Sequence, residues 1–390
     1  MSHFIVRIFQ FVALAGCLSS SIYYLICLWS VLLFLRRRKA GRSVSLAQAR
    51  PPVSMLKPLK GTDPDIYESF RSHCLQDYPE YEIIFGVSDP DDPAVTSVQQ
   101  LHREFPDHAI RLVVCPNKLG ANVKVSNLEQ MLSAARYEHL LVNDSDIRVE
   151  NDYLRWVIAP LADARVGMVT CLYRGAAAST VGSQLESLGI GTDFCAGVLV
   201  ARQLEGGLRF GLGSTLAFRR ADLERIGGFR SIVDFLADDY ELGRRIAGLG
   251  LQVVLSGAVV ETHLPAYDLR GFLAHQLRWA RGVRDSRAGG YVGLVATYGL
   301  MWALLVLIAA RAAPWSLAVV GTTVLLRLAV ALAVGKVVLA DQRMLRQLWL
   351  LPVRDLVAVA VWVASFVGHT VTWRGDRFEL KNGRLKRIAP

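Results

Sequence analysis

The feature that most constrains this chain is an uncharged apolar stretch close to its N-terminus. Residues 9–35 read FQFVALAGCLSSSIYYLICLWSVLLFL, and RRRK follows at 36–39. A helix of this length can cross about 30 Å of hydrocarbon, and the basic residues after it favour a cytoplasmic C-terminal end. A secretory signal peptide is the alternative, but the apolar core is too long and no small-residue cleavage pattern follows it. We therefore interpret residues 1–36 as a transmembrane anchor.

Apolar character returns in the last quarter of the chain. Further membrane segments are expected at 291–310, 315–340 and 356–368. Arg327 lies inside one of them, and such a charge is expected to face protein or water rather than lipid. The segment LLPVRDL at 350–356 is also compatible with a position flat on the interface. We take 291–372 as transmembrane or interfacial and 373–390 as a basic tail, which three crossings would place outside, against the positive-inside tendency.

The formal net charge of +10 raises the question of a nucleic-acid partner. The basic residues cluster beside the apolar segments, at 36–42, at 270–287 and in the tail, which fits anionic lipid headgroups and a phosphate-bearing substrate better. We therefore expect no nucleic acid. Six cysteines without CxxC spacing indicate reduced thiols and no metal framework. Four histidines without metal-site spacing are expected on the surface or in the core: His73, His102, His108 and His139.

Between residues 50 and 290, short apolar runs alternate with amphipathic stretches, which is typical of an α/β domain with a largely parallel sheet. Strands are expected at 52–59, 81–89, 110–116, 139–144, 166–173 and 251–257. Helices are expected at 65–75, 94–105, 123–135, 153–159 and 238–249. A dinucleotide-binding fold requires GxGxxG directly after the first strand. That turn is missing, and GLGSTL at 211–216 comes too late, so hydride-transfer chemistry is discounted.

Carboxylates follow two of the expected strands, at the edge where open α/β sheets bind ligands. They are Asp89, Asp92, Asp144 and Asp146. Asp144 and Asp146 stand one residue apart, and such charges repel unless a cation or a proton lies between them. Hard oxygen ligands suit Mg²⁺ or Mn²⁺ carrying a diphosphate. The alternative is that Asp-Ser-Asp only forms a turn and caps the next element, and the tripeptide alone favours that interpretation.

Several motifs together resemble the membrane-bound ceramide glucosyltransferase family, family 21, which consists of inverting enzymes with a GT-A fold. The motifs are VSMLKPLKGTDP (53–64), VSDPDDPA (87–94), NKLGANVKVSNL (117–128), NDSDIRV (143–149), ADDYELGRRIAGLG (237–250) and HQLRW (275–279). The segments HQLRWARG and FLADDYELG are similar in sequence to those of bacterial hopanoid-associated glycosyltransferases. The resemblance implies an α/β GT-A domain at 50–290, facing the cytoplasm of a bacterium and flanked by membrane helices at both ends.

The resemblance also assigns residues to a nucleotide-sugar site. Asp92 matches the first family aspartate, with Asp89 beside it, and a plain turn is the alternative for both. Asp144 matches the second, and Asp146 would complete a Mg²⁺ or Mn²⁺ pair, although many relatives have glycine there. Lys124 would reach a phosphate, unless it belongs to a solvated helix face. Further candidates have equally plain structural alternatives: Lys118, Asn127, Gly211, Gly213, Ser214 and His263.

The third family aspartate matches Asp239, to which the family assigns the role of general base. An inverting transfer requires a group that takes the proton of the attacking hydroxyl. The alternative is that Asp238 or Asp239 is only the N-cap of the following helix.

HQLRW matches the family's (Q/R)xxRW motif at Arg278 and Trp279, and His275 departs from it. A guanidinium can bind a diphosphate in a bidentate manner. A juxtamembrane helix in which Arg278 meets lipid headgroups is the alternative.

The expected function is therefore the transfer of glucose or N-acetylglucosamine from a UDP-sugar to a hydroxyl of a membrane lipid, either a hopanoid polyol or ceramide. The predicted enzyme is an integral protein of a bacterial inner membrane. A processive polysaccharide synthase is a rival, but it would need more membrane helices to line a channel. A non-catalytic receptor for UDP-sugars is another rival, and it would be expected to lack Asp239.

Overall fold

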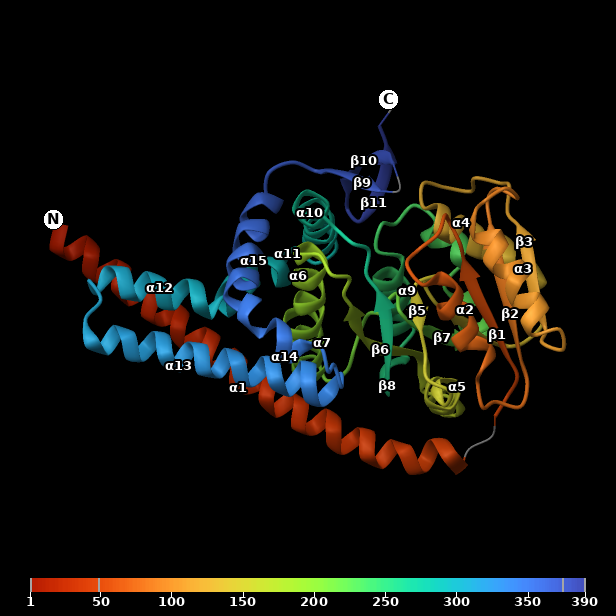
Figure 1. The fold of residues 1–390 in the computed structure, drawn as a ribbon, viewed down its shortest axis with the longest axis horizontal. Helices are drawn as coiled ribbons and strands as arrows, with labels where there is room; N and C mark the ends of the chain where they lie inside the picture. The colour runs from red at the N-terminus through yellow and green to blue at the C-terminus, as the bar shows by residue number, and fades with distance from the viewer. Residues whose placement is uncertain (1, 48–49, 374, 389–390) are drawn as a thin grey trace. The chain divides into compact units, whose positions relative to one another are not determined.

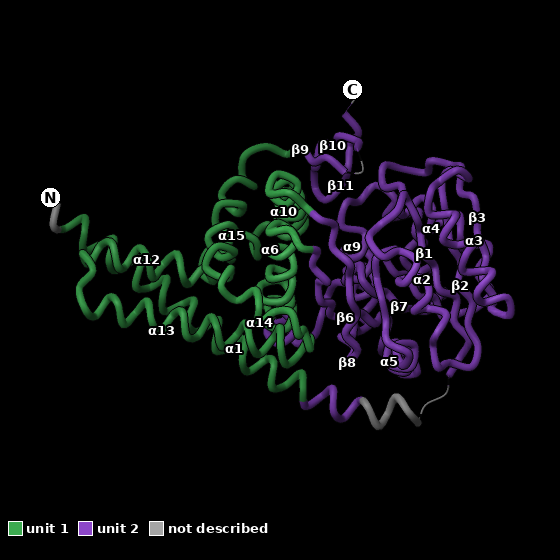
Figure 2. The backbone as a smooth tube through the Cα atoms, in the orientation of Figure 1, with its two compact units in different colours: residues 1–35, 179–200, 267–369 green, residues 36–178, 201–266, 370–390 purple. Residues whose placement is uncertain are grey.

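The computed structural model describes residues 2–47, 50–373 and 375–388, which form two compact units (Figures 1 and 2). We call residues 36–178, 201–266 and 370–390 the sheet unit. Residues 1–35, 179–200 and 267–369 are the helical unit. The chain thus leaves and re-enters each unit more than once, and α1 (Ser2–Ala47) contributes to both.

Among its described residues, the sheet unit contains an eight-stranded sheet with the order β3-β2-β1-β4-β7-β6-β8-β5. The strands are β1 (Val53–Pro58), β2 (Tyr81–Val87), β3 (Ile110–Val114), β4 (His139–Val142), β5 (Ile147–Arg148), β6 (Val166–Ala176), β7 (Leu216–Arg219) and β8 (Gln252–His263). β3, β2, β1 and β4 are parallel neighbours, as are β6 and β8. β7 is antiparallel to both β4 and β6, and β5 is antiparallel to β8.

The sheet is therefore mixed, and the prediction of a largely parallel sheet is correct only for part of it. The error arises from the antiparallel strands β5 and β7, which were not predicted; β5 has only two residues, too few to show a periodic pattern. The expected helices are confirmed to within two residues, except that α4 ends at Met131 and continues as a 3₁₀ turn to Ala134. The helices of this unit are α2 (Ile66–Cys74), α3 (Ala94–Glu104), α4 (Val123–Met131), α5 (Tyr153–Ile158), α8 (Arg220–Arg225) and α9 (Asp238–Gly248).

The segment predicted as a basic tail forms a small antiparallel sheet of β9 (Thr370–Trp373), β10 (Asp376–Lys381) and β11 (Arg384–Arg387). This C-terminal sheet belongs to the sheet unit. Its buried side chains pack against Ala121 and Leu236, and they are Val371, Phe378, Leu380 and Leu385. The backbone N–H of Leu385 donates to the carbonyl of Asp234 (2.7 Å), and the N–H of Leu236 donates to the carbonyl of Gly383 (3.0 Å).

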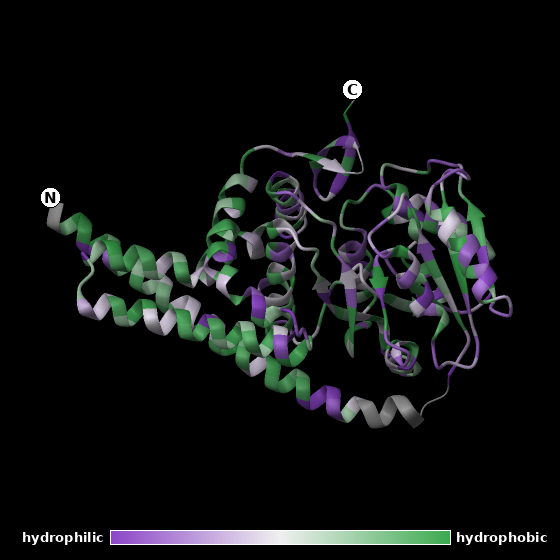
Figure 3. Ribbon diagram, in the orientation of Figure 1, coloured by the Kyte–Doolittle hydropathy of each residue, from purple (hydrophilic) through white to green (hydrophobic). Residues whose placement is uncertain are grey.

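The helical unit carries the apolar segments, and Figure 3 shows hydrophobic residues along most of α1, α12 and α13. Its other helices are α6 (Val181–Gly189), α7 (Cys195–Leu204), α10 (Leu269–Ser286), α11 (Ala288–Gly293), α12 (Gly299–Ala309), α13 (Pro314–Ala331), α14 (Met344–Gln347) and α15 (Leu351–Ser365). In the described chain, three helical stretches are long and apolar enough to cross a membrane: Phe4–Gly41, Pro314–Val338 and Met344–Ser365. The pair Ala288–Thr297 and Gly299–Ala309, bent by 49°, qualifies as a fourth if it acts as one span.

Arg327 lies on α13, and its side chain is only 7% exposed. Its Nη2 donates to Oδ1 of Asp193 (2.6 Å) and to Oδ1 of Asp355 (2.7 Å). The prediction that this arginine faces protein rather than lipid is confirmed. The six cysteines all lie within described residues and are buried.

Candidate functional site

Two carboxylates and one ammonium group meet at the edge of the sheet where the parallel strands β1 and β4 end. Asp144 is the second residue after the end of β4, and Lys124 lies in the first turn of α4. Lys124 Nζ is 2.7 Å from Oδ1 of Asp144 and 3.0 Å from Oδ2 of Asp238, in the first turn of α9. Burial acts to lower the pKa of Lys124, but the carboxylates of Asp144 and Asp238 raise it above its ordinary value. The lysine is therefore a fixed positive charge.

Asp144 and Asp239 both approach Gly213. A Cβ placed on Gly213 would lie 2.9 Å from Oδ2 of Asp144 and 3.3 Å from Oδ2 of Asp239. Oδ2 of Asp239 accepts a hydrogen bond from the backbone N–H of Gly213 (2.7 Å). A Cβ at this position would crowd both carboxylates, so the absence of a side chain at Gly213 allows their close approach.

The helix-cap alternative for Asp238 and Asp239 does not describe this site. Ala237 is the N-cap of α9, and no side chain caps that end. Oδ1 of Asp239 accepts from the N–H of Tyr240 (2.8 Å). Burial, followed by the charge of Asp238, raises the pKa of Asp239 to about 6. A carboxylate with such a pKa is ionised at neutral pH and basic enough to take up a proton from a reacting group.

Asp146 is held by a neighbouring strand. Its Oδ2 accepts from the hydroxyl of Thr262 on β8 (2.5 Å). Burial and the charge of Asp144 raise the pKa of Asp146 to about 6. Residues 145 and 146 form a turn, as the plainer interpretation of the tripeptide predicted.

Lys57 is a site residue that the sequence analysis missed. It lies on β1, is fully buried, and its Nζ donates to the backbone carbonyl of Asp144 (3.1 Å). Burial lowers its pKa to about 7, although Asp146 and Asp144 act in the opposite direction. The available signal was a lysine in an otherwise apolar strand, because a fully buried lysine needs a partner.

Asp89 and Asp92 lie in a turn after β2, as the plainer interpretation predicted. Oδ1 of the exposed Asp89 accepts from the N–H of Asp91 (3.0 Å). Both carboxylate oxygens of Asp92 accept from the N–H of Gly61 (3.0 and 2.9 Å), and Oδ1 also accepts from Ala94 N–H (2.9 Å). Asp92 thus holds the loop after β1 against the start of α3.

The remaining candidates from the sequence divide between this edge and the surface. Lys118 is exposed, and Asn127 is buried with its side chain accepting from Ser88 Oγ (2.9 Å). The backbone N–H of His263 donates to the carbonyl of Asp146 (3.3 Å), and its Nδ1 lies 2.9 Å from Oδ2 of Asp65. His263 therefore lies directly beside Asp146 and Asp65.

Arg278 and Trp279 lie on α10, which belongs to the helical unit. The ring of Trp279 contacts that of His275 at a centroid distance of 5.3 Å, and His275 stacks on Tyr267 at 5.4 Å. Nδ1 of His275 is 3.2 Å from Oε1 of Glu186, whose side chain is only 1% exposed. His275, which departs from the motif, thus lies between the buried carboxylate of Glu186 and the ring of Trp279, one helical turn further along α10.

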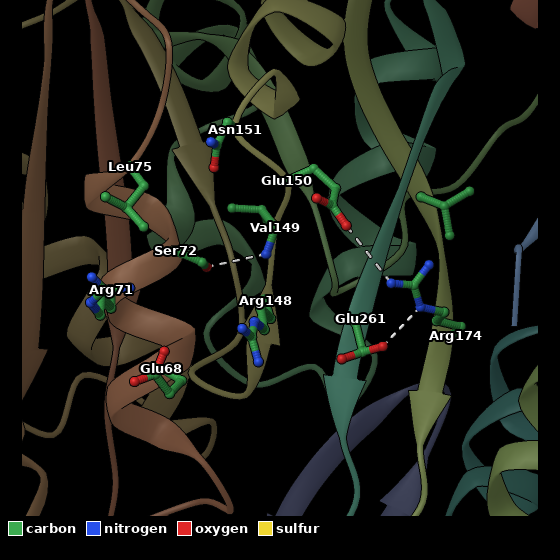
Figure 4. A pocket seen from close by; sticks show the side chains of 11 residues that line it. Glu68, Arg71, Ser72, Leu75, Arg148, Val149, Glu150, Asn151, Arg174 and Glu261 are labelled. Carbon is green, nitrogen blue, oxygen red and sulfur yellow. Dashed lines mark hydrogen bonds and ion pairs between the residues drawn. The ribbon is translucent and has the colours of Figure 1, made fainter. Parts of the chain in front are cut away.

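A polar cavity of about 320 Å³ also lies in the sheet unit, between α2, β6 and β8 (Figure 4). Three arginines and three glutamates line it, and Arg174 is 2.8 Å from Glu261 and 3.9 Å from Glu150. Its charges are therefore partly matched within the protein. None of the predicted site residues lines this cavity.

The residues at the strand edge fit a divalent cation that arrives with a nucleotide diphosphate. Among the described residues, no group of three or more His, Cys, Asp or Glu side chains is arranged to hold a metal ion. Mg²⁺ sites of nucleotide enzymes do not need such a group, because one or two carboxylates suffice when substrate phosphates and water complete the coordination. Asp144, with a side chain 40% exposed and Asp146 next to it, meets that requirement.

The fold is that of the GT-A glycosyltransferases. The chain is similar to the mannosyltransferase PcManGT of Pyrobaculum calidifontis, with a TM-score of 0.52 and 21% identity, covering 91% of this chain and 99% of that one. The sequence profile of glycosyl transferase family 21 matches residues 12–386, so the chain belongs to this family.

Relatives with known names agree with this assignment. Ceramide glucosyltransferase 1 of Caenorhabditis elegans is 25% identical over 274 residues, which is 70% of this chain and 58% of the relative. Ceramide glucosyltransferase 3 of the same organism is 25% identical over 59% of this chain and 50% of its own length. The ceramide glucosyltransferase of Komagataella phaffii is 35% identical over 101 residues, 25% of this chain and 20% of the relative. The match thus spans between 50% and 58% of the length of the first two relatives.

Proposed function

We propose that this protein transfers a sugar, either glucose or N-acetylglucosamine, from a UDP-sugar to a hydroxyl of a membrane lipid with inversion at the anomeric carbon. The acceptor is a hopanoid polyol or ceramide. Membership of family 21 and relatives named ceramide glucosyltransferase support this reaction. The observation that carries it is the approach of Asp144 and Asp239 to one point beside Gly213. A residue for the diphosphate and a residue for the acceptor must lie on either side of the reacting carbon.

At the anomeric carbon, the proposed step forms one bond and breaks one, and a proton is transferred from the acceptor. The lipid hydroxyl oxygen attacks C1 of the sugar, and the bond from C1 to the diphosphate oxygen breaks, so that UDP leaves with the bonding electron pair. The hydroxyl proton passes to the carboxylate of Asp239, which Gly213 N–H and Tyr240 N–H hold in one orientation. Because attack and departure occur on opposite faces, an α-linked donor gives a β-linked product.

Basic residues offset the charge that develops on the departing UDP. Lys124, fixed between Asp144 and Asp238, is available to a phosphate oxygen. Arg278 offers a bidentate guanidinium, and Trp279 provides an aromatic wall for the sugar or acceptor. Asp92 and Asp89 belong to the loop that would border the nucleotide.

A bound Mg²⁺ or Mn²⁺ would supply charge neutralisation on the diphosphate, and Asp144 with Asp146 would hold it. The neighbour PcManGT, solved with GDP-Man and Mn²⁺, supports a divalent ion by analogy. We place the sheet unit in the cytoplasm of a bacterial cell, because UDP-sugars are made there and because RRRK follows the N-terminal anchor.

The decisive experiment incubates the full chain in lipid nanodiscs with UDP-glucose or UDP-N-acetylglucosamine and a total lipid extract. New glycolipids are then identified by mass, with Asp239→Asn as control. One sugar added to one lipid, dependent on a divalent ion, is the expected result. A ladder of longer products would indicate a processive synthase, and UDP-sugar binding without turnover would indicate a receptor.

A further inference from the structure

The long apolar helix at the C-terminal end of the helical unit has its two ends attached to the same charged helix. Gln276 of α10 accepts from Arg354 Nη2 with its Oε1 (3.1 Å). Further along α10, Arg281 Nη2 donates to the carbonyl of Val367 (2.6 Å). Arg284 donates to the carbonyls of Ser365 and Gly368, the latter at 3.1 Å. These cationic groups cap the C-terminal carbonyls of α15, which the helix dipole favours.

These attachments place α15 at the depth of α10. From Gln276 to Arg284, α10 rises about 12 Å at 1.5 Å per residue, so a crossing orientation of α15 would draw this charged part of α10 into the hydrocarbon with it. α10 carries five charged residues, which are Arg270, Arg278, Arg281, Arg284 and Asp285. Charges within hydrocarbon are strongly disfavoured. α10, and α15 with it, therefore belong at the membrane surface.

The C-terminal sheet leads to the same conclusion through a separate observation. β9, β10 and β11 pack on Ala121 and Leu236 and exchange backbone hydrogen bonds with residues 234 and 236 of the sheet unit. The chain before α10 and the chain after α15 must therefore lie on one side of the membrane. The number of complete crossings between them is even, whereas three candidate spans lie in that interval: the bent pair, Pro314–Val338 and Met344–Ser365. At least one of the three therefore does not cross.

The other two candidate spans have the features of a helical hairpin. Gln10 of α1 donates to the carbonyl of Ala309 (2.8 Å), and Ser19 of α1 donates to the carbonyl of Ala296 (2.9 Å). Between residues 10 and 19, α1 thus runs antiparallel to residues 296–309 of the bent pair. A turn with positive φ at Arg311 (52°) and Ala312 (56°) then reverses the chain into α13. These helices form one apolar bundle, with Arg311 exposed at the turn.

We propose that Met344–Ser365 lies along the membrane surface, with a stripe of exposed apolar side chains in one leaflet, and that the chain crosses three times, through α1, the bent pair and α13. The stripe follows helical spacing, at Leu345, Trp349, Val353, Leu356, Ala360, Val363 and Val367. Among the large side chains of the stripe, the exposed fraction ranges from 45% at Val353 to 73% at Val367. The opposite face carries the buried Arg354 and Ser365.

One consequence concerns the lipid substrate. α10 carries Arg278 and Trp279, and its attachment to α15 holds them at headgroup depth. The hydroxyl of a membrane lipid also lies at that depth, so it can be reached without removing the acyl chains from the bilayer. The topology itself does not depend on the proposed transfer, and its test measures no activity.

Membrane depth is tested with variants of the full chain in nanodiscs that each carry one added cysteine, at Trp349, Leu356 or Val363. The added cysteine is labelled with a bimane fluorophore. The native cysteines are buried, which limits background labelling. Nitroxide lipids carry the quencher either near the headgroup or at mid-chain. We expect the shallow quencher to act at least twofold more strongly at all three positions. Leu325, on α13 and 69% exposed, is the matched control and should prefer the deep quencher. Preferential deep quenching at Leu356 would overturn the proposal.

Sidedness is tested by labelling Arg311→Cys, Lys386→Cys and Arg103→Cys with an impermeant maleimide in intact cells and after lysis. All three positions are exposed. We expect Arg311→Cys to react in intact cells, and the other two to react only after lysis. Reaction of Lys386→Cys in intact cells, with Arg103→Cys still protected, would place the tail across the membrane and refute an even number of crossings.

Discussion

Replacing Asp239 with asparagine separates its chemical role from its structural one, because the structural effects nearly cancel. Its two oxygens accept from Gly213 N–H (2.7 Å) and Tyr240 N–H (2.8 Å). In asparagine one oxygen becomes an amide NH₂, so one of these donors loses its acceptor. An unsatisfied buried donor costs about 1–3 kcal/mol.

The charge of Asp239 has the opposite effect on stability. Burial raises its pKa to about 6 from an ordinary value of 3.8. Between these values the folded state binds more protons than the unfolded state, so the free energy of unfolding falls as pH rises through that window. At pH 7.5 the ionised carboxylate therefore destabilises the fold, by roughly 3 kcal/mol at 1.36 kcal/mol per pKa unit. Asparagine removes this penalty, and we expect the stability of Asp239→Asn to lie within about 2 kcal/mol of wild type.

Activity should respond very differently from stability. General base catalysis contributes about 10²–10⁴-fold, so we expect kcat of Asp239→Asn to fall at least a hundredfold. The wild-type kcat/KM should also decrease below about pH 6, because the base is then protonated. UDP release by protein in nanodiscs, with thermal unfolding measured on the same samples, gives both quantities.

Asp238→Asn is the matched control for this experiment. Asp238 loses its contact with Lys124 in this variant, but Asp144 still holds the lysine. We expect a loss of less than tenfold. The assignment of the base is refuted if Asp239→Asn keeps more than a tenth of wild-type kcat with an unchanged unfolding midpoint, or if Asp238→Asn is the inactive variant.

Three further substitutions test other parts of the site. Asp144→Asn should reduce kcat/KM at least tenfold and weaken the response to Mn²⁺ added back after chelation; an unchanged Mn²⁺ titration would exclude this residue as a ligand. Arg278→Lys keeps the charge but loses the bidentate fork, so kcat should fall roughly tenfold while the KM for lipid stays nearly constant, and full activity would contradict the assigned role. Phe378→Ala removes a buried ring from the C-terminal sheet, a change that typically costs about 3–5 kcal/mol. It should speed amide hydrogen exchange at Leu385, whose N–H donates to Asp234, and unaltered exchange would show that the sheet is held in some other way.

The sequence predicted the part of the fold that depends on local patterns. Apolar runs identified β1, β2, β3, β4, β6 and β8, and amphipathic stretches identified the helices between them. Asp144 was predicted from its place at the end of a strand, whereas Asp239 was predicted only from the resemblance to the family motif. The distance between the two carboxylates was not predictable, because it depends on Gly213, which lies far from both in sequence.

Residues whose position is set by a distant partner were missed or misjudged. Lys57 lies in a strand that appears purely structural, and only the fold shows its amine directed at the carbonyl of Asp144. The C-terminal sheet consists largely of polar and basic residues, so its sequence resembles that of an unstructured tail. Only the fold shows that Phe378 and Leu385 pack against Ala121 and Leu236. Hydropathy likewise cannot distinguish a spanning helix from one attached along a charged neighbour.

The electrostatics of the sheet edge explain why two of its carboxylates have raised pKa values. Four carboxylates meet there, those of Asp144, Asp146, Asp238 and Asp239, against the ammonium groups of Lys57 and Lys124. Burial is the larger cause of the rise in the pKa values of Asp146 and Asp239 to about 6, and the neighbouring carboxylates Asp144 and Asp238 add to it. A nucleotide diphosphate adds further negative charge, so donor binding at neutral pH requires additional positive charge at this edge. The crowding of carboxylates therefore contributes both to the raised pKa values and to the proposed need for a divalent cation.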